Sequence, residues 1–257
     1  MAAGRAPSSP EGLFSLTGRT ALVTGARTGI GRAIALGLAA AGADLVLHGR
    51  DDDLGEVEAE VRRTGRRVSR WVLDLSEPGR IPEAAARLDP VDVLVNNAGI
   101  IHRAPAAEHR YADFRRVLDV DLDAVWLLSQ AVGARMLERG SGKIIMIASM
   151  LSFQGGINVP GYTAAKHAVA GLTRALACEW AARGVQVNAI APGYIATANT
   201  ERLRADPVRE AEIAGRIPAG RWGEPDDLVG AAVFLASRAS DYVNGHVLAV
   251  DGGWLAR

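Results

Sequence analysis

The chain is poor in cysteine, in net charge and in long apolar runs, and each absence excludes a class of protein. Its one cysteine, Cys178, cannot form an intrachain disulfide, which is typical of a reducing compartment, so we expect a cytoplasmic protein. Lys and Arg together number 29, as do Asp and Glu, so the basic excess of proteins that bind nucleic acids or membrane surfaces is missing. No apolar run approaches the roughly 18 residues that a transmembrane helix requires. We therefore expect neither nucleic-acid nor membrane partners.

What the chain does have is enough apolar sequence for a large core. Of its 257 residues, 49% are hydrophobic and 23% are charged, and no linker-like segment divides them. The first residues, MAAGRAPSSPEG, are small and polar and lack the apolar segment of a signal peptide. We expect a flexible tail over residues 1–15, a single domain over 16–257, and Cys178 as a small residue of its core.

Strand-like and helix-like segments alternate along the chain. Strands are expected over 20–24, 43–49, 66–75, 91–97, 142–149, 185–192 and 246–253. Helices are expected over 30–42, 52–65, 81–88, 110–138, 160–183, 199–215 and 225–237. The strands are continuous apolar runs, as in sheets that are covered on both faces. We predict an α/β fold, with a doubly wound parallel sheet of about seven strands and helices on both faces.

The segment TGARTGIG, residues 24–31, lies directly between the first expected strand and the first expected helix. Gly25, Gly29 and Gly31 would let the backbone turn tightly and let a pyrophosphate approach the free N–H groups at the start of the helix. The alternative is a tight turn that serves only helix–strand packing. In this context we predict a nucleotide site, and the expected contacts are Gly25, Arg27, Thr28, Gly29, Ile30 and Gly31.

Two further strand ends fit a dinucleotide. Asp74 and Leu75 end the third expected strand, where a carboxylate can accept a hydrogen bond from the adenine amino group; the alternative is that Asp74 caps a helix. The segment NNAG follows the fourth strand, where Asn97, Ala98 and Gly99 allow a flat loop against the adenosine ribose. Because ligands of such sheets bind beyond the carboxyl ends of the strands, these positions are expected to meet one molecule.

The end of the second strand bears on the choice between NAD and NADP. An acidic residue there would bind the ribose hydroxyls of NAD, but the sequence has Gly49 followed by Arg50. Together with Arg27, Arg50 could bind a 2′-phosphate, which favours NADP. In the alternative, Arg50 is a solvated loop residue and Asp51 or Asp52 supplies the carboxylate.

Tyr162 and Lys166 lie four residues apart in GYTAAKHAV, within an expected helix. Residues at i and i+4 share a helix face, so the phenol and the ammonium can converge. A free phenol is a poor proton donor or acceptor at neutral pH, and a fixed ammonium nearby favours its ionised form. The pair is therefore a candidate acid/base, because reduction of a ketone by hydride leaves an alkoxide that needs a proton.

Five features in order resemble the short-chain dehydrogenase/reductase family from about residue 16 to 253: TGARTGIG, NNAG, Ser149 at the end of the fifth strand, YTAAK and APGYIAT. The resemblance implies a single-domain Rossmann fold and hydride transfer between a nicotinamide cofactor and an alcohol or ketone. By position, Tyr162 resembles the general acid/base, Lys166 the group that favours the phenolate and holds the nicotinamide ribose, and Ser149 the donor that steadies the substrate oxygen. The nicotinamide-side contacts it implies are Pro192, Gly193, Ile195 and Thr197.

One position departs from the family pattern. The family usually has an asparagine that helps to hold a proton-relaying water near the lysine, and the matching residue in DLDAVW is Asp121. A carboxylate could hold the same water, but its negative charge opposes a phenolate at Tyr162. We therefore expect Asp121 to support catalysis with a pH optimum shifted upward; the alternative is little kinetic effect. A dinucleotide-binding protein without catalysis is a more remote alternative.

The segments IASMLSFQGG, APGYIATANTERLRAD and ASDYVNGHVLAVDGGWLAR further resemble a subgroup that acts on deoxy keto-sugar acids released from uronate polymers such as pectin. The subgroup usually uses NAD, which conflicts with Gly49 and Arg50, so the cofactor is left as NAD(P). Another sugar acid or a polyol is the alternative substrate. The family's usual assembly is a homotetramer through the two long helices and the C-terminal edge.

The resemblance places a substrate lid near residues 194–222. Gln154 and Asn199 could reach substrate hydroxyls, and the candidates for the substrate carboxylate are Arg103, Arg202, Arg204, Arg216 and Arg221. The histidines show no metal-ligand spacing, so we expect no catalytic metal. His102, just after NNAG, could lie at the edge of the active site, whereas the other histidines are expected at the surface or in the core.

Overall fold

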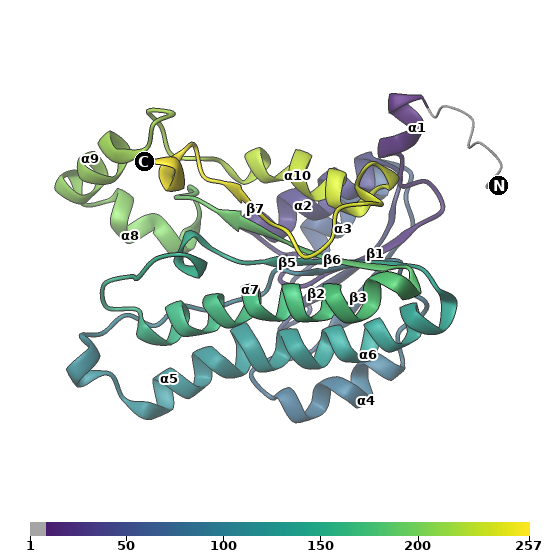
Figure 1. The fold of residues 1–257 in the computed structure, drawn as a ribbon, viewed down its shortest axis with the longest axis horizontal. Helices are drawn as coiled ribbons and strands as arrows, with labels where there is room; N and C mark the ends of the chain where they lie inside the picture. Colours follow the sequence, from purple (N-terminus) through teal and green to yellow (C-terminus); the bar gives the residue numbers. More distant parts are fainter. Residues whose placement is uncertain (1–8) are drawn as a thin grey trace.

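Seven parallel strands form one sheet at the centre of residues 9–257, the part of the chain that this computed structural model describes (Figure 1). The strands are β1 (Thr20–Val23), β2 (Asp44–Gly49), β3 (Val68–Val72), β4 (Val93–Asn96), β5 (Gly142–Ile147), β6 (Val185–Pro192) and β7 (Val247–Val250). Their order across the sheet is β3-β2-β1-β4-β5-β6-β7, so the direction of winding reverses between β1 and β4. The predicted doubly wound parallel sheet is confirmed.

The register of β1 with its two neighbours determines where a ligand can bind. Val23 of β1 lies beside Leu47 of β2 and beside Val95 of β4, so the loops that follow these three strands begin at the same edge. In doubly wound sheets, ligands bind in the crevice outside the carboxyl ends at the reversal point. The glycine loop, the NNAG loop and the end of β2 therefore meet there.

Helices cover both faces of the sheet, as Figure 1 shows. One layer contains α2 (Gly29–Ala40), α3 (Gly55–Arg63) and α10 (Val229–Ala236), and the other contains α4 (Ile81–Ala86), α5 (Tyr111–Leu118), α6 (Ala124–Arg139) and α7 (Pro160–Trp180). Two further helices, α8 (Glu201–Arg204) and α9 (Pro207–Arg216), lie outside these layers, in the expected lid region. Among the helices of residues 9–257, none is long and apolar enough to cross a membrane.

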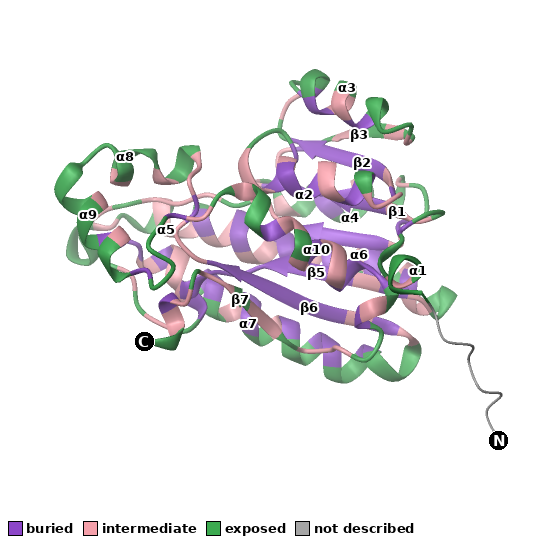
Figure 2. Cartoon of the chain, turned by 90° about the horizontal axis from the view of Figure 1, so that it is seen from above, coloured by how far each residue is buried: buried purple, intermediate pink, exposed green. Residues whose placement is uncertain are grey.

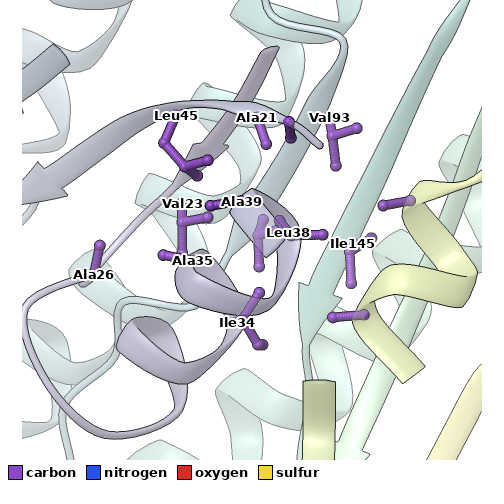
Figure 3. Close-up of a cluster of buried hydrophobic side chains, with 14 of the residues drawn as sticks. Ala21, Val23, Ala26, Ile34, Ala35, Leu38, Ala39, Leu45, Val93 and Ile145 are labelled. Atoms are coloured by element: carbon purple, nitrogen blue, oxygen red, sulfur yellow. The ribbon is translucent and has the colours of Figure 1, made fainter. Parts of the chain in front are cut away.

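The apolar strands make a separate core with each helix layer. Figure 2 shows that the central strands are buried along most of their length. On one face, Ile34 and Leu38 of α2 pack into the cluster that contains Val93 and Ile145 (Figure 3). On the other face, α6 and α7 cover the second cluster. Burial of continuous apolar strands on both faces explains the absence of the alternating pattern that a half-exposed sheet would show.

The predicted long helix over 110–138 is interrupted. Between α5 and α6 the chain forms a π-helical turn at Asp119–Asp123, which turns the side chain of Asp121 into the interior. Such turns insert one residue into the helical repeat and are frequent at functional sites. The sequence DVDLD contains no proline or glycine that would signal a break in the helix, so the sequence predicted one continuous helix here.

The helix expected over 199–215 is also divided. Pro207 cannot continue the hydrogen bonding of a preceding helix, but it suits the first turn of a new one. Asp206 caps that new helix, since its carboxylate accepts hydrogen bonds from the N–H groups of Val208 and Arg209 at 3.0 and 3.2 Å. The lid region therefore contains the two short helices α8 and α9.

Two expectations concern single segments. The expected tail over residues 1–15 lies partly outside the described residues, but its second half contains the one-turn helix α1 (Pro10–Phe14), which Ser9 caps. The ring of Phe14 lies 6.4 Å from that of Phe234 on α10. Cys178 is exposed, although a core position was expected. It lies on the outer face of α7, whose inner face carries the buried Ala177 and Trp180.

Candidate active site

A cavity of about 470 Å³ opens at the carboxyl edge of the sheet, at the point where the strand order reverses. All the residues predicted above to contact a dinucleotide line this cavity. Ser149, Asp121 and Asn199 line it as well. The structure therefore brings together residues from eight separate loops and helices, which the sequence connects only through the order of its motifs.

The glycine loop has the geometry that a bound pyrophosphate requires. Gly25 and Gly29 have φ angles of +64° and +57°, which favour glycine. A Cβ atom on Gly31 would lie 2.2 Å from the carbonyl oxygen of Gly25, so a larger residue would displace the loop. Helix α2 begins at Gly29, and within the described chain no side chain caps its first turn, which leaves N–H groups for an anion.

Asn97 fixes the glycine loop to the end of β4. Its side-chain amide donates to the carbonyl oxygens of Thr24 and Gly25 at 2.8 and 3.3 Å. The hydroxyl of Thr24 in turn accepts hydrogen bonds from the N–H groups of Asn97 and Ala98, each at 2.9 Å. The amide of Asn97 therefore holds two cofactor loops in one arrangement.

His48 was expected at the surface or in the core, and the structure places it in the cavity wall with 2% of its surface exposed. Its Nδ1 accepts a hydrogen bond from the N–H of Gly25 at 3.1 Å, so its Nε2 carries the proton and donates to the carbonyl oxygen of Leu73 at 3.0 Å. Burial lowers the pKa of His48 to about 4, which keeps the ring neutral. A neutral histidine thus ties the glycine loop to β2 and to the end of β3.

The part of the cavity wall beside the ends of β2 and β3 contains several charged groups. Asp74 lies in a turn after β3, where its carboxylate accepts the N–H of Ser76 at 2.9 Å. This bond, with the charges of Arg50 and Arg116, lowers the pKa of Asp74. Asp74 thus fixes its own turn and lines the cavity, and it does not cap the 3-10 helix Pro78–Arg80, whose N-cap residue is Glu77. Arg116 of α5, which the sequence analysis missed, lines the cavity too.

Arg27 and Arg50 both line the cavity, and so does the carboxylate that lies between them. Asp51 lies 3.3 Å from Arg27 and 3.8 Å from Arg50. A second carboxylate, that of Asp53, also lies 3.3 Å from Arg27 but is not among the residues described in the cavity wall. A Cβ atom on Gly49 would lie 2.8 Å from the carbonyl oxygen of Asp51, so an acidic residue does not fit there without a shift.

Tyr162 and Lys166 share one face of α7 and line the same cavity. The ammonium of Lys166 lies 5.3 Å from the centre of the Tyr162 ring. Ser149 is the second residue after β5, and its hydroxyl oxygen accepts a hydrogen bond from the N–H of Leu151 at 3.1 Å. The three side chains line the same cavity, as the sequence predicted, and this arrangement supports the roles that the resemblance implies.

Lys166 is held in place from two sides, although only 5% of its side chain is exposed. Its ammonium donates to the carbonyl oxygen of Ile147 at 2.9 Å and lies 3.4 Å from Oδ2 of Asp121. Burial is the largest single influence and disfavours the charged form, but Asp121 and Tyr162 together outweigh it and raise the pKa of Lys166. The lysine therefore stays protonated.

Asp121 is fully buried in the π-helical turn. Its Oδ1 accepts the N–H of Ile100 at 2.7 Å, and its Oδ2 packs against Gly99, where a Cβ atom would lie 2.9 Å away. Burial raises the pKa of Asp121, although Lys166 and the N–H of Ile100 oppose this shift. Unlike an amide, this carboxyl group can hold a proton.

The substrate candidates are only partly brought together. Asn199 lines the cavity, but Gln154 is not among the described residues in its wall, so the expected contact of Gln154 is not supported. None of the five candidate arginines is among the described lining residues either. Arg103 and Arg204 come nearest, since they donate to the main-chain oxygens of Asn199 and Thr197 at 3.1 and 3.2 Å.

Arg221 and Arg216 have other partners. The guanidinium of Arg221 forms an ion pair with Asp227 at 2.7 Å, and that of Arg216 stacks on a tryptophan ring. His102 is likewise not among the lining residues described, and its ring lies 4.9 Å from that of His109. Within residues 9–257, no group of three or more His, Cys, Asp and Glu side chains is arranged to hold a metal ion.

Comparisons with known proteins agree with this geometry. A family model described as enoyl-(acyl carrier protein) reductase matches residues 25–255. The chain is 58% identical to the 2-dehydro-3-deoxy-D-gluconate 5-dehydrogenase of Bacillus subtilis (strain 168), over 95% of this chain and 97% of that one. It is 52% identical to the protein of the same name from Escherichia coli (strain K12), over 95% and 98% of the two chains.

A solved structure shows the same similarity. The gluconate 5-dehydrogenase of Burkholderia cenocepacia J2315, in complex with NADP and tartrate, is 41% identical to this chain. The match covers 96% of this chain and 99% of that one, with a TM-score of 0.92.

The buried His48 predicts a loss of stability in acid. Its folded pKa of about 4 lies below the unfolded value of about 6.5, so protons bind the unfolded state first as the pH falls. We expect this group's share of the free energy of unfolding to be complete above pH 6.5 and to fall by about 3 kcal/mol towards pH 4. Denaturant titrations at several pH values in this range give the free energy of unfolding at each pH. This free energy should fall less steeply with decreasing pH for His48→Asn than for the wild type, and an equally steep fall in both proteins would contradict the prediction.

Asp121 predicts a displaced pH–rate profile. Replacing it by asparagine removes a buried negative charge that opposes the phenolate, so the rising limb of kcat for alcohol oxidation should move to lower pH by about one unit. The matched control is Asp119→Asn, two residues away, because Asp119 pairs with Arg115 instead. An unmoved profile in Asp121→Asn, or an equal shift in the control, would disprove the role of Asp121.

Proposed function

The chain belongs to the short-chain dehydrogenase/reductase family, and on this premise we propose that it transfers hydride between NAD(P) and a deoxy keto-sugar acid. The substrate is 2-dehydro-3-deoxy-D-gluconate, which reacts at C5, or 2-deoxy-D-gluconate, which reacts at C3. The observation that carries the proposal is the convergence of Ser149, Tyr162 and Lys166 in the wall of the cavity that the glycine loop also lines.

The cavity fits the cofactor that this reaction requires. A helix N-terminus faces it, and the glycine loop leaves no space for side chains where a pyrophosphate must approach. When bound, the nicotinamide gives or accepts the hydride. Gly25, Gly29 and Gly31 would hold the phosphates, and Lys166 would hold the nicotinamide ribose.

The protein's own groups handle the proton. The hydroxyl of Ser149 donates a hydrogen bond to the substrate oxygen and fixes its position. The phenol of Tyr162 gives that oxygen a proton in reduction and removes one in oxidation. Lys166 stabilises the phenolate, and Asp121 keeps Lys166 protonated. The side chains present are those of a working enzyme, which argues against a protein that only binds a dinucleotide.

The substrate class rests on the relatives and on the lid near residues 194–222. Asn199 lines the cavity and would meet a substrate hydroxyl. Arg103 and Arg204 contact the main chain at Asn199 and Thr197, so they are the best placed of the candidate arginines for the carboxylate. Another sugar acid or a polyol remains the second candidate, because a gluconate 5-dehydrogenase is also similar over nearly the whole chain.

The setting of the reaction is part of the proposal. We propose one catalytic domain from about residue 16, preceded by a tail, in a cytoplasmic homotetramer that serves the breakdown of uronate polymers such as pectin. The long helices α6 and α7 and the C-terminal edge would form its interfaces. Substrate, rather than nucleic acid or membrane, is the partner that the neutral net charge favours.

Asp51 determines which nicotinamide cofactor is preferred. Its carboxylate occupies the space between the guanidiniums of Arg27 and Arg50, where the 2′-phosphate of NADP would be bound. Asp51→Asn should therefore raise the ratio of kcat/KM with NADP to kcat/KM with NAD by about tenfold. Asp53→Asn removes an equally close carboxylate that the described cavity wall does not contain, and should leave the ratio nearly unchanged. Equal ratios in both variants would contradict this assignment.

The proposed function is tested by absorbance of reduced nicotinamide. Purified protein with 2-dehydro-3-deoxy-D-gluconate and either NAD⁺ or NADP⁺ should reduce the cofactor. Tyr162→Phe should lower kcat by about 10³-fold or more and leave cofactor binding intact, because it removes only the transferable proton. Absence of turnover with deoxy keto-sugar acids but rapid turnover of another sugar acid or a polyol would favour the second candidate. Undiminished activity of Tyr162→Phe would contradict the proposal.

A further inference from the structure

The C-terminal segment GGWLAR is a motif that the proposed chemistry does not use. It follows β7 and lies next to α9 at the end of the molecule that carries the lid (Figure 1). Trp254 in this segment is only 5% exposed. Other side chains must therefore cover the ring of Trp254, and the burial of the ring stabilises their arrangement.

Trp254 belongs to a third apolar cluster, which is distinct from the two cores of the sheet. Its members come from four parts of the chain, namely the segment after β5, the segment after β6, the lid and the C-terminus. The buried members are Met150, Ile213, Ile217, Trp222 and Trp254, and Tyr194, Leu203, Ala214 and Leu255 pack against them. The cluster thus joins the residue after Ser149 to both ends of the lid.

Tyr194 lies at the centre of the aromatic contacts. Its ring centre lies 4.8 Å from that of Trp254 and 5.3 Å from that of Trp222, at interplanar angles of 65° and 72°. These are the edge-to-face arrangements that aromatic rings prefer. Because Tyr194 begins the lid region and Trp222 ends it, this trio forms a fixed base on which the lid is mounted.

Arg216 connects that base to the lid. It is the last residue of α9, and its guanidinium lies 4.1 Å from the centre of the Trp254 ring, in a cation–π contact. Within residues 9–257, no ion pair or hydrogen bond of the Arg216 side chain competes with this contact. The C-terminal tryptophan therefore holds the end of the lid helix.

The turn that carries Trp254 is itself fixed. The carboxylate of Asp251 accepts the N–H groups of Gly253 and Leu255, each at 2.9 Å. The carbonyl oxygen of Gly252 accepts the N–H of Ala219, in the lid, at 3.0 Å. The ring of Trp254 is thus presented to Arg216 from a rigid turn rather than from a free chain end.

We propose that Trp254 is a positioning residue that holds the lid over the substrate end of the cavity. It acts through Arg216 and Tyr194, and it touches neither substrate nor cofactor. The lid residues Thr197, Ala198, Asn199 and Thr200 line the cavity at the opposite end of the held segment, so release of α9 loosens substrate contacts and leaves the acid/base groups in place. The inference rests on the proposed function of the lid.

The kinetic test compares Trp254→Ala with Trp254→Phe. We expect Trp254→Ala to raise KM for the sugar acid by about tenfold while kcat changes by less than about threefold, because ground-state contacts weaken and the chemistry does not. Trp254→Phe keeps an aromatic face for Arg216 and should retain a KM within about threefold of the wild type. A fall in kcat with unchanged KM in both variants would indicate a merely structural role and overturn the proposal.

A second readout does not depend on activity. The lid contains the trypsin sites Arg202, Arg204 and Arg209, and their cleavage should be at least about fivefold faster in Trp254→Ala and in Arg216→Ala if the lid is released. Arg209→Ala is the matched control for Arg216→Ala, since Arg209 also lies on α9 but pairs with Glu212. If trypsin cleaves Arg216→Ala and Trp254→Ala at Arg202, Arg204 and Arg209 no faster than it cleaves the wild type, the proposal is overturned. Faster cleavage in a protein that turns over no sugar acid would uphold the role in the lid and refute the proposed substrate.

Discussion

The buried ion pair of Lys166 and Asp121, 3.4 Å apart, is the interaction on which the site depends. Two charges removed from water are stable only when each is paired and hydrogen-bonded. Here β5 supplies the carbonyl oxygen of Ile147, and the loop after β4 supplies the N–H of Ile100. The pair therefore requires that α7, the π-helical turn and both loops occupy fixed positions, and those positions also place Tyr162 and Ser149 in the cavity wall.

The same cavity shows two ways of holding a charged ligand. At the glycine loop, the groups that face the cavity are the neutral N–H groups of a helix N-terminus, and the amide of Asn97 and the uncharged ring of His48 hold that loop in place. Beside the end of β2, the groups are charged, since Asp51 lies between Arg27 and Arg50. Neutral contacts suit the pyrophosphate that NAD and NADP share, whereas charged groups distinguish the 2′-phosphate that only NADP carries.

Much of this arrangement was predictable, because the parallel sheet places its strand ends together and each motif marks one strand end. The doubly wound parallel sheet and the meeting of the motif loops at one of its edges followed from that rule. The role of His48 did not, since a histidine in an apolar strand has no spacing signal until its partners at Gly25 and Leu73 are known. The π-helical turn and the exposure of Cys178 depend on which face of its helix each residue occupies, and the composition of a helical segment does not determine this. Gln154 is not among the described residues of the cavity wall, so its contact with substrate stays a prediction.

Hydride transfer from a sugar-acid carbon to the cofactor at this site can be followed directly with an isotope. 2-Dehydro-3-deoxy-D-gluconate deuterated at C5 would be incubated with the protein and oxidised cofactor, and the reduced nicotinamide would be examined by mass spectrometry and NMR. We expect the deuterium to appear on the nicotinamide ring and the labelled substrate to react more slowly than the unlabelled one. Reduced cofactor without deuterium, or bound cofactor without any reaction, would contradict this expectation.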